Sequence, residues 1–177
     1  MSKLITLFFL ILLLCLPSYS QTDSDRRDVK FVRDNFVSKI DTNDLDVTVY
    51  DLGNVPEPKQ LYRNTVRLQI EMQVFTIKCK VKKIIKEKDG DYHIIVEDLI
   101  HTGSTMIIEV VNPSEVGTKF YSQIKKVRKF LLNNHLLMVN KTIIVSGVAF
   151  FDIKHNQKGI APNGIELHPV LKLNFAK

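Results

Sequence analysis

One segment of this sequence has a clear helical periodicity, while its neighbours have the periodicity of strands. This contrast limits the possible folds more than any other feature. Phe120, Ile124, Val127 and Leu131 recur at alternating intervals of four and three residues, which places them on one face of a helix. This spacing predicts a helix over residues 114–134, with Ser114 able to cap its start. The rest of the strongly patterned sequence reads as strand, so we expect a mainly β protein with one central helix.

Five segments have the alternating or β-branched patterns of strands: residues 65–86, 92–97, 105–111, 140–151 and 165–173. The first is long enough to be one bent strand or two strands joined by a bulge. Asp89-Gly90 predicts a tight hairpin turn after it, because the turn needs positive φ angles that Gly adopts freely. Pro169 cannot donate a ladder hydrogen bond, so the last strand should lie at an edge or be irregular there.

The N-terminal third of the chain divides into a leader and an extension. Residues 1–20 combine Lys3 with an apolar run over 4–16 and small residues before Gln21, which predicts a cleaved signal peptide. The alternative is an uncleaved N-terminal membrane anchor. Cleavage would leave Cys79 as the sole cysteine and no transmembrane span, so we expect an exported protein, periplasmic or extracellular, without an internal disulfide.

The extension, residues 21–60, is expected to be a short helix followed by a loop. Val29, Val32, Phe36 and Ile40 recur at helical spacing and predict an amphipathic helix over 28–40. Asp25 or Asp28 could cap this helix. Residues 41–60 are rich in turn formers, with one short strand expected at 45–50.

The net positive charge of the chain is compatible with an anionic partner but does not require one. The chain has 25 Lys and Arg against 19 Asp and Glu, and loss of Lys3 with the leader leaves a net charge of +5. Lysines recur along the first long strand (Lys78, Lys80, Lys82, Lys83) and along the helix (Lys119, Lys125, Lys126, Lys129). We interpret both basic faces as solvated; the alternative is a surface for an anionic ligand or a phosphate backbone.

The order strand-strand-strand-helix-strand-strand over residues 61–177 resembles the OB-fold, a five-stranded Greek-key barrel. A long bent first strand fits this resemblance, because such a strand can serve both sheets of a barrel. The alternative is another α+β domain. The resemblance implies an OB-fold-like barrel preceded by a short N-terminal helix, with faces that often take single-stranded nucleic acid or oligosaccharide.

Two narrower resemblances follow from local motifs. The segments KDGDYHIIVED, STMIIEVVNPS and VSGVAFFDIKHNQKGIAPNGIELHPVLKL are similar to a group of uncharacterised exported bacterial proteins; this resemblance implies export and an OB-like domain, and no activity. The turn with Asp91 and the segment with Glu115 also resemble staphylococcal-nuclease-like OB domains. Ile107 or Ile108 and Asn112 stand where that family has its arginine and aspartate, so the resemblance implies no nuclease activity here.

Candidate chemistry is concentrated in residues 142–172, where two apolar runs flank a polar loop. Asp152, His155, Glu166 and His168 form the candidate metal or acid/base set, because imidazole and carboxylate together suit Zn²⁺, Mn²⁺ or Fe²⁺. His93 and Glu109, on neighbouring strands, would join them if their faces coincide. The full candidate ligand-binding set is His93, Glu109, Asp152, His155, Gln157, Asn163, Glu166 and His168.

Three functions remain open at this level. The first is an exported binding or interaction module of OB type. The second is a metal-dependent hydrolase, with phosphodiesters as one substrate class, in which metal-bound water attacks and a carboxylate acts as base. The third is a structural envelope protein whose polar loop only bonds its own backbone.

Overall fold

A computed structural model describes residues 25–154 and 158–177 of the chain; the expected signal peptide, His155 and Gln157 lie outside these ranges. The strands are β1 (Asp41–Val47), β2 (Gln73–Lys86), β3 (Tyr92–Asp98), β4 (Thr105–Val110), β5 (Thr142–Phe151) and β6 (Ile165–Phe175). The helices are α1 (Arg26–Lys30), α2 (Val49–Gly53) and α3 (Tyr121–Met138), with 3-10 turns at Val37–Lys39, Ile70–Met72 and Pro113–Glu115.

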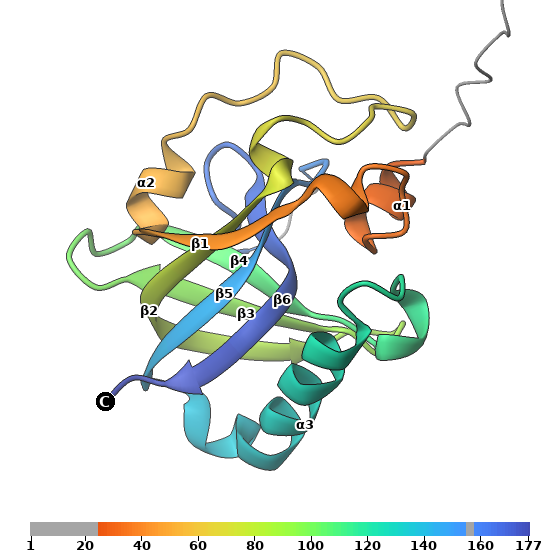
Figure 1. Cartoon of the computed structure of the whole chain (residues 1–177). Helices are drawn as coiled ribbons and strands as arrows, with labels where there is room; N and C mark the ends of the chain where they lie inside the picture. Colours follow the sequence, from red (N-terminus) through yellow and green to blue (C-terminus); the bar gives the residue numbers. More distant parts are fainter. Residues whose placement is uncertain (1–24, 155–157) are drawn as a thin grey trace, which may run out of the picture.

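The strands close into a five-stranded barrel in the order β2-β3-β4-β6-β5 and back to β2 (Figure 1). β2 makes the closure possible because its first half pairs with β5 and its second half pairs with β3. A register shift between Val81 and Lys83 bends it between the two partners. β4 and β6 pair in parallel and the other barrel pairs are antiparallel. This is the expected OB-like order, with one long helix between its third and fourth strands.

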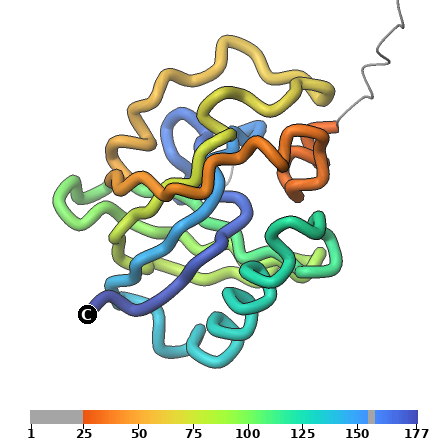
Figure 2. The backbone as a smooth tube through the Cα atoms, viewed as in Figure 1, coloured from red at the N-terminus to blue at the C-terminus, as the bar shows by residue number. Residues whose placement is uncertain are grey.

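The barrel interior and its lid form one apolar core. Buried side chains of all five barrel strands meet there with Val127, Leu131 and Met138 of α3, which closes one end. A second core lies between the barrel and the N-terminal segment, where Phe31, Val32 and Phe120 pack together. Figure 2 shows segment 25–69 crossing one end of the barrel while α3 lies at the other. No helix in the described ranges is long and apolar enough to cross a lipid bilayer.

The predicted N-terminal helix over 28–40 is wrong in length. α1 begins after the Asp25 cap and ends at Lys30, because Val32 has a φ of 49°, which no continuing helix allows. The buried carboxylate of Asp34 then accepts a hydrogen bond from the N–H of Phe36. The strand expected at 45–50 occurs as β1, four residues earlier, and Tyr50 lies in α2, which the sequence analysis missed. Thr48 and Asp51 form a capping box at the start of α2.

Residues 65–72 do not form the first part of a strand, although Val66, Leu68 and Ile70 alternate. Arg67 is turned inward to Asp34, and the N–H of Leu68 donates to the buried carboxylate of Glu71. These ionic contacts, which an alternation pattern does not register, hold the segment in a turn until β2 begins.

The long helix also begins later than predicted, at Tyr121 rather than Ser114. The N–H of Gly117 donates to the carbonyl oxygen of Phe31 at 3.1 Å, so this segment is fastened to the N-terminal extension before the helix starts. The helix continues to Met138, four residues beyond the predicted end.

Pro169 lies at an irregular point of β6 and not at a sheet edge, because β6 has β4 and β5 on its two sides. The register with β5 shifts between Gly147 and Ala149. A Cβ atom on Gly147 would lie 2.9 Å from both the Leu167 Cβ and the Pro169 carbonyl oxygen, so glycine is what permits the close approach. The shift changes the strand's parity: Val170 joins Leu167 and Leu173 in the barrel core, against the alternation in the sequence.

Candidate ligand cleft and buried ionic cluster

A cleft of about 410 Å³ lies on the outer face of β2, β3 and β4. Its lining consists of Lys83, Ile85, Glu87, His93, Ile95, Ile107 and Lys158. Strand pairing explains this composition, because Lys83, Ile95 and Ile107 are direct cross-strand neighbours, as are Ile85 and His93. The cleft therefore has an apolar floor, two lysines, one histidine and one glutamate, Glu87, which lies 3.6 Å from Nδ1 of His93.

The loop after β5 forms one wall of the cleft. Gly159 has a φ of 84°, and a Cβ atom there would lie 2.5 Å from the Ile95 Cγ2 atom. Only glycine allows both the backbone angle and this approach. The close contact helps to bury Ile95 and places Lys158 at the cleft.

His93 joins the cleft to a buried ionic cluster. Its Nε2 atom lies 2.7 Å from Oε1 of Glu109, its cross-strand partner on β4. Oε2 of Glu109 lies 2.7 Å from Nε2 of His168 on β6. Burial alone would raise the pKa of Glu109, but His168, His93 and Lys30 outweigh it and hold this pKa well below its usual range. Glu109 is thus an ionised carboxylate between two imidazoles.

His168 is fully buried between the aromatic rings of Phe31 and Phe150. Its Nδ1 atom donates to the carbonyl oxygen of Lys30 at 2.8 Å, since a carbonyl can only accept. The Nε2 atom has no well-directed hydrogen bond despite its 2.7 Å approach to Glu109. This close approach of an imidazole nitrogen to a carboxylate oxygen joins His168 of β6 to Glu109 of β4.

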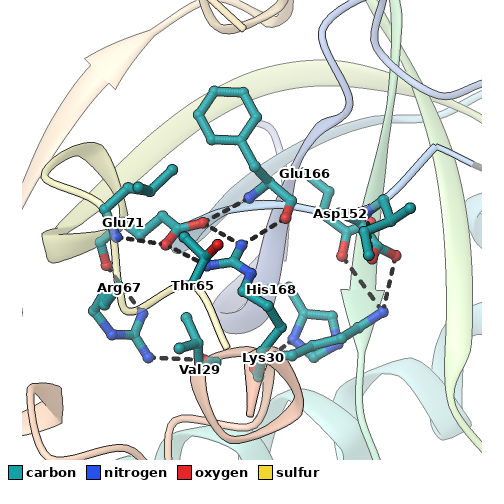
Figure 3. Close-up of polar contacts among 12 residues, drawn as sticks. Val29, Lys30, Thr65, Arg67, Glu71, Asp152, Glu166 and His168 are labelled. Carbon is teal, nitrogen blue, oxygen red and sulfur yellow. Dashed lines mark hydrogen bonds and ion pairs between the residues drawn. The ribbon is translucent and has the colours of Figure 1, made fainter. Parts of the chain in front are cut away.

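Lys30 supplies a cation to the other side of the cluster. Its Nζ atom lies 3.2 Å from Glu109, 3.3 Å from Asp152 and 3.6 Å from Glu166. Figure 3 shows this side chain extended toward the carboxylates of Asp152 and Glu166. Burial alone would lower the pKa of Lys30, but the three carboxylates raise it above its usual value. Burial, and then repulsion from Glu109, raises the pKa of Glu166 well above its usual range.

A second ionic network fastens the N-terminal segment beside this cluster. Arg26 makes a bidentate pair with Glu71, at 2.6 and 2.9 Å, and also donates to the carbonyl oxygen of Phe151. Glu71 accepts from the N–H groups of Leu68 and Phe151, and Arg67 donates to the carbonyl oxygens of Val29 and Glu71 (Figure 3). Arg67 also pairs with the carboxylate of Asp34. All four charged side chains are buried. This network is a structural anchor, because it leaves no charged group facing solvent.

The structure brings together five members of the predicted ligand-binding set: His93, Glu109, Asp152, Glu166 and His168. Asn163 lies elsewhere, where its side-chain NH₂ donates to the carbonyl oxygens of Leu52 and Val55 and holds the chain that follows α2. His155 and Gln157 lie outside the described residues.

The metal set predicted from sequence does not appear as a group among the described residues. The His, Asp and Glu side chains whose ligand atoms all lie within 4.8 Å of one another are instead Asp91, Glu109 and His168. Burial raises the pKa of Asp91, while a hydrogen bond from the N–H of Asn112 opposes this shift. Metal binding by the set of Asp152, His155, Glu166 and His168 stays a prediction, since His155 lies outside the described residues.

Sequence reasoning missed Lys30, Asp91, Lys158 and most of the cleft floor. Lys30 belongs to the N-terminal extension, and nothing in its local pattern indicates that it reaches strands more than seventy residues away. The cleft floor had a signal in the sequence, since Ile95 and Ile107 are on predicted strands, but the pairing register was needed to join them. Comparisons with protein-family models, curated proteins and solved structures found no match to this chain.

Proposed function

We propose that this protein is an exported ligand-binding module of OB type, and that its ligand is a small anion with an apolar body. The observation that carries the proposal is the cleft over β2, β3 and β4. The strand face and the adjoining loops are where OB barrels commonly bind ligands. Export rests on the predicted signal peptide and is part of the proposal.

The lining favours this ligand class over the usual partners of OB barrels. Lys83 and Lys158 offer ammonium groups, and Ile85, Ile95 and Ile107 offer an apolar floor. No Phe or Tyr side chain is among the described residues that line the cleft, and His93 is its one aromatic ring. Single-stranded nucleic acid depends on aromatic stacking for much of its affinity, so this surface lacks the expected platform. A carboxylate or phosphate on an aliphatic body matches both parts of the cleft.

A tryptophan reporter provides the test. The chain has no Trp, so Ile85→Trp places a single indole in the cleft and Tyr62→Trp places one on an exposed loop as the matched control. We expect decanoate or octyl phosphate to change the emission of the Ile85→Trp protein alone. Adding Lys83→Ala and Lys158→Ala should weaken that binding by about tenfold or more, because two charge-assisted contacts are lost.

Three results would contradict the proposal. One is an identical response from both reporters. The other is unchanged affinity after both lysines are removed. A response to a single-stranded oligonucleotide but to neither amphipathic anion would also overturn the ligand class and restore the nucleic-acid alternative.

A second candidate function, metal-dependent hydrolysis, is favoured by the group of Asp91, Glu109 and His168. Two carboxylates and an imidazole suit Zn²⁺, Mn²⁺ or Fe²⁺. The Nδ1 contact of His168 with a backbone carbonyl is the outer contact that metal-binding histidines commonly make. His93 contacts both Glu109 and the cleft, so a substrate in the cleft would lie beside this group.

The melting temperature, measured with EDTA and with each metal, tests this second candidate. A metal at a hundredfold excess over its dissociation constant should stabilise the fold by about 2.7 kcal/mol. Asp91→Asn should abolish the shift if the group identified here binds the metal, whereas Asp152→Asn should abolish it if the set predicted from sequence does. Absence of a shift with every metal would remove metal-dependent hydrolysis.

A further inference from the structure

The exposed face of α3 combines positive charge with protruding leucines. The first half of the helix exposes Lys125, Lys126 and Lys129, whereas Arg128 is turned back to donate to backbone carbonyls, and the helix contains no Asp or Glu. Its second half exposes Leu132, Leu136 and Leu137, with exposed fractions of 48%, 85% and 64%. A core-covering helix needs none of these leucines at the surface, since Ile124, Val127, Leu131 and Met138 already form its buried face.

Two grooves extend this face on either side of the leucines. A groove of about 530 Å³ is lined by Lys125, Lys126, Lys129 and Leu132, among others. A groove of about 810 Å³ joins Leu137 to Leu99 and Phe175, with Lys78, Lys141 and Lys177 around them. Neither groove has an acidic side chain among its described lining residues. Ile100, next to Leu99 at the β3–β4 turn, is 77% exposed.

We infer that this face binds the surface of an anionic lipid bilayer, with α3 lying in the plane of the headgroups. Lysines would contact lipid phosphates while Leu136 and Leu137 enter the acyl boundary. The inference is independent of the ligand cleft, because none of the cleft residues belongs to this face. Figure 1 shows α3 and the C-terminus at the end of the molecule opposite the segment that follows α2, so a flat surface can approach them.

The composition of this face argues against a nucleic acid and against an acidic protein as its partner. A nucleic acid would use the lysines, but exposed leucines give its bases no flat ring on which to stack. An acidic protein partner would require a complementary apolar pocket for the most exposed leucine. A bilayer satisfies charge and apolar exposure together, and it requires no matching shape.

Co-sedimentation with vesicles tests the inference. The purified protein should bind phosphatidylglycerol vesicles and bind phosphatidylcholine vesicles much more weakly, with the difference disappearing at high salt. Lys125→Glu/Lys126→Glu should weaken binding to the anionic vesicles by about tenfold or more. Leu136→Ser/Leu137→Ser should also weaken it by about tenfold or more, through the loss of apolar burial. All four positions are exposed, so both variants should keep the fold.

Matched controls are Lys59→Glu/Arg63→Glu for charge and Leu45→Ser for apolar exposure, since these residues are exposed and belong to other parts of the surface. Neither control should change vesicle binding. Residues 4–16 are identical in all variants and controls. Vesicle binding by this apolar run is therefore common to all of them, and the test compares one variant with another.

Three outcomes would overturn the inference. One is vesicle binding that is equal in the α3 variants and the controls. Another is oligonucleotide binding that the lysine variant loses and the leucine variant keeps, which would assign the face to nucleic acid. The third is a dimer that the leucine variant converts to monomer with vesicle binding unchanged, which would assign it to a second copy of the chain.

Discussion

The two ends of the barrel place charge and apolar surface in opposite ways. At the end covered by the N-terminal segment, Arg26, Arg67, Asp34 and Glu71 are buried and paired. At the end closed by α3, the large apolar side chains of Leu136 and Leu137 face solvent. Buried charges need a partner inside the molecule, and exposed leucines gain by finding one outside. The comparison indicates that the first end is built to hold the fold together and the second to meet a partner.

The largest loss of stability is expected when Glu71 is removed from the buried network. Glu71→Ala leaves the guanidinium of Arg26 buried without its partner and two backbone N–H groups without an acceptor. We expect the free energy of unfolding to fall by about 3 to 5 kcal/mol. Urea denaturation would measure it. Glu115→Ala is the control, because its pair with Arg27 is exposed and should contribute less than about 1 kcal/mol. Equal losses of unfolding free energy in Glu71→Ala and Glu115→Ala would show that the buried network is not an anchor.

Lys30 tests whether the ionic cluster depends on its ammonium group. Lys30→Met keeps the aliphatic stem but leaves Glu109, Asp152 and Glu166 without a shared cation. We expect a loss of about 2 to 3 kcal/mol, less than for Glu71 because the lysine is partly exposed. Adding Asp152→Asn should recover part of the loss, because one repelling charge is removed. A double variant as unstable as the sum of both single variants would contradict the coupling.

Asp98 tests the role of a buried charge at the β3–β4 turn, where it precedes the exposed Leu99 and Ile100 and accepts a hydrogen bond from Tyr50 of α2. Burial alone would raise its pKa, but hydrogen bonds from the N–H groups of His101, Tyr50 and Ile100 lower it to about 2. This depressed pKa corresponds to roughly 2 kcal/mol of stability at neutral pH.

The lowered pKa of Asp98 fixes the direction in which stability changes with pH. The stabilisation is complete above the unfolded-state pKa, near 4, and is lost as pH falls through about 2. Asp98→Asn should therefore destabilise the protein at neutral pH and differ little from the unmodified protein in strong acid. Thermal melts across this pH range would measure it, with the exposed Asp46→Asn as control. A destabilisation that does not change with pH would contradict an effect of the charge.

The smallest effect is expected from the exposed leucines. Leu136→Ser should change the free energy of unfolding by less than about 0.5 kcal/mol, because its side chain is already in water in the folded protein. Chemical denaturation would measure it, with the buried Leu131→Ala as the contrasting variant at a loss of about 2 to 5 kcal/mol. A large loss in Leu136→Ser would mean that this leucine supports the fold rather than a partner surface.

The pattern of apolar residues in the sequence was enough to predict the barrel and the positions of most of its strands. Periodicity over β3, β4 and β5 gave the elements nearly to the residue, because apolar alternation reports directly which side of a strand meets the core. It also placed His93 and Glu109 on neighbouring strands and grouped Glu166 with His168. These are local regularities, which a chain carries in its own order of residues.

Three features depend on long-range contacts and could not be predicted from the alternation of apolar residues. Arg67 and Glu71 lie in a segment with a strand-like pattern that is not a strand, since ion pairs to distant residues override the pattern. The bulge opposite Gly147 moves Val170 into the core, and Lys30 reaches its three carboxylates from outside the barrel. In each case the energy comes from partners far apart in the sequence, and a one-dimensional pattern holds no information about their distance.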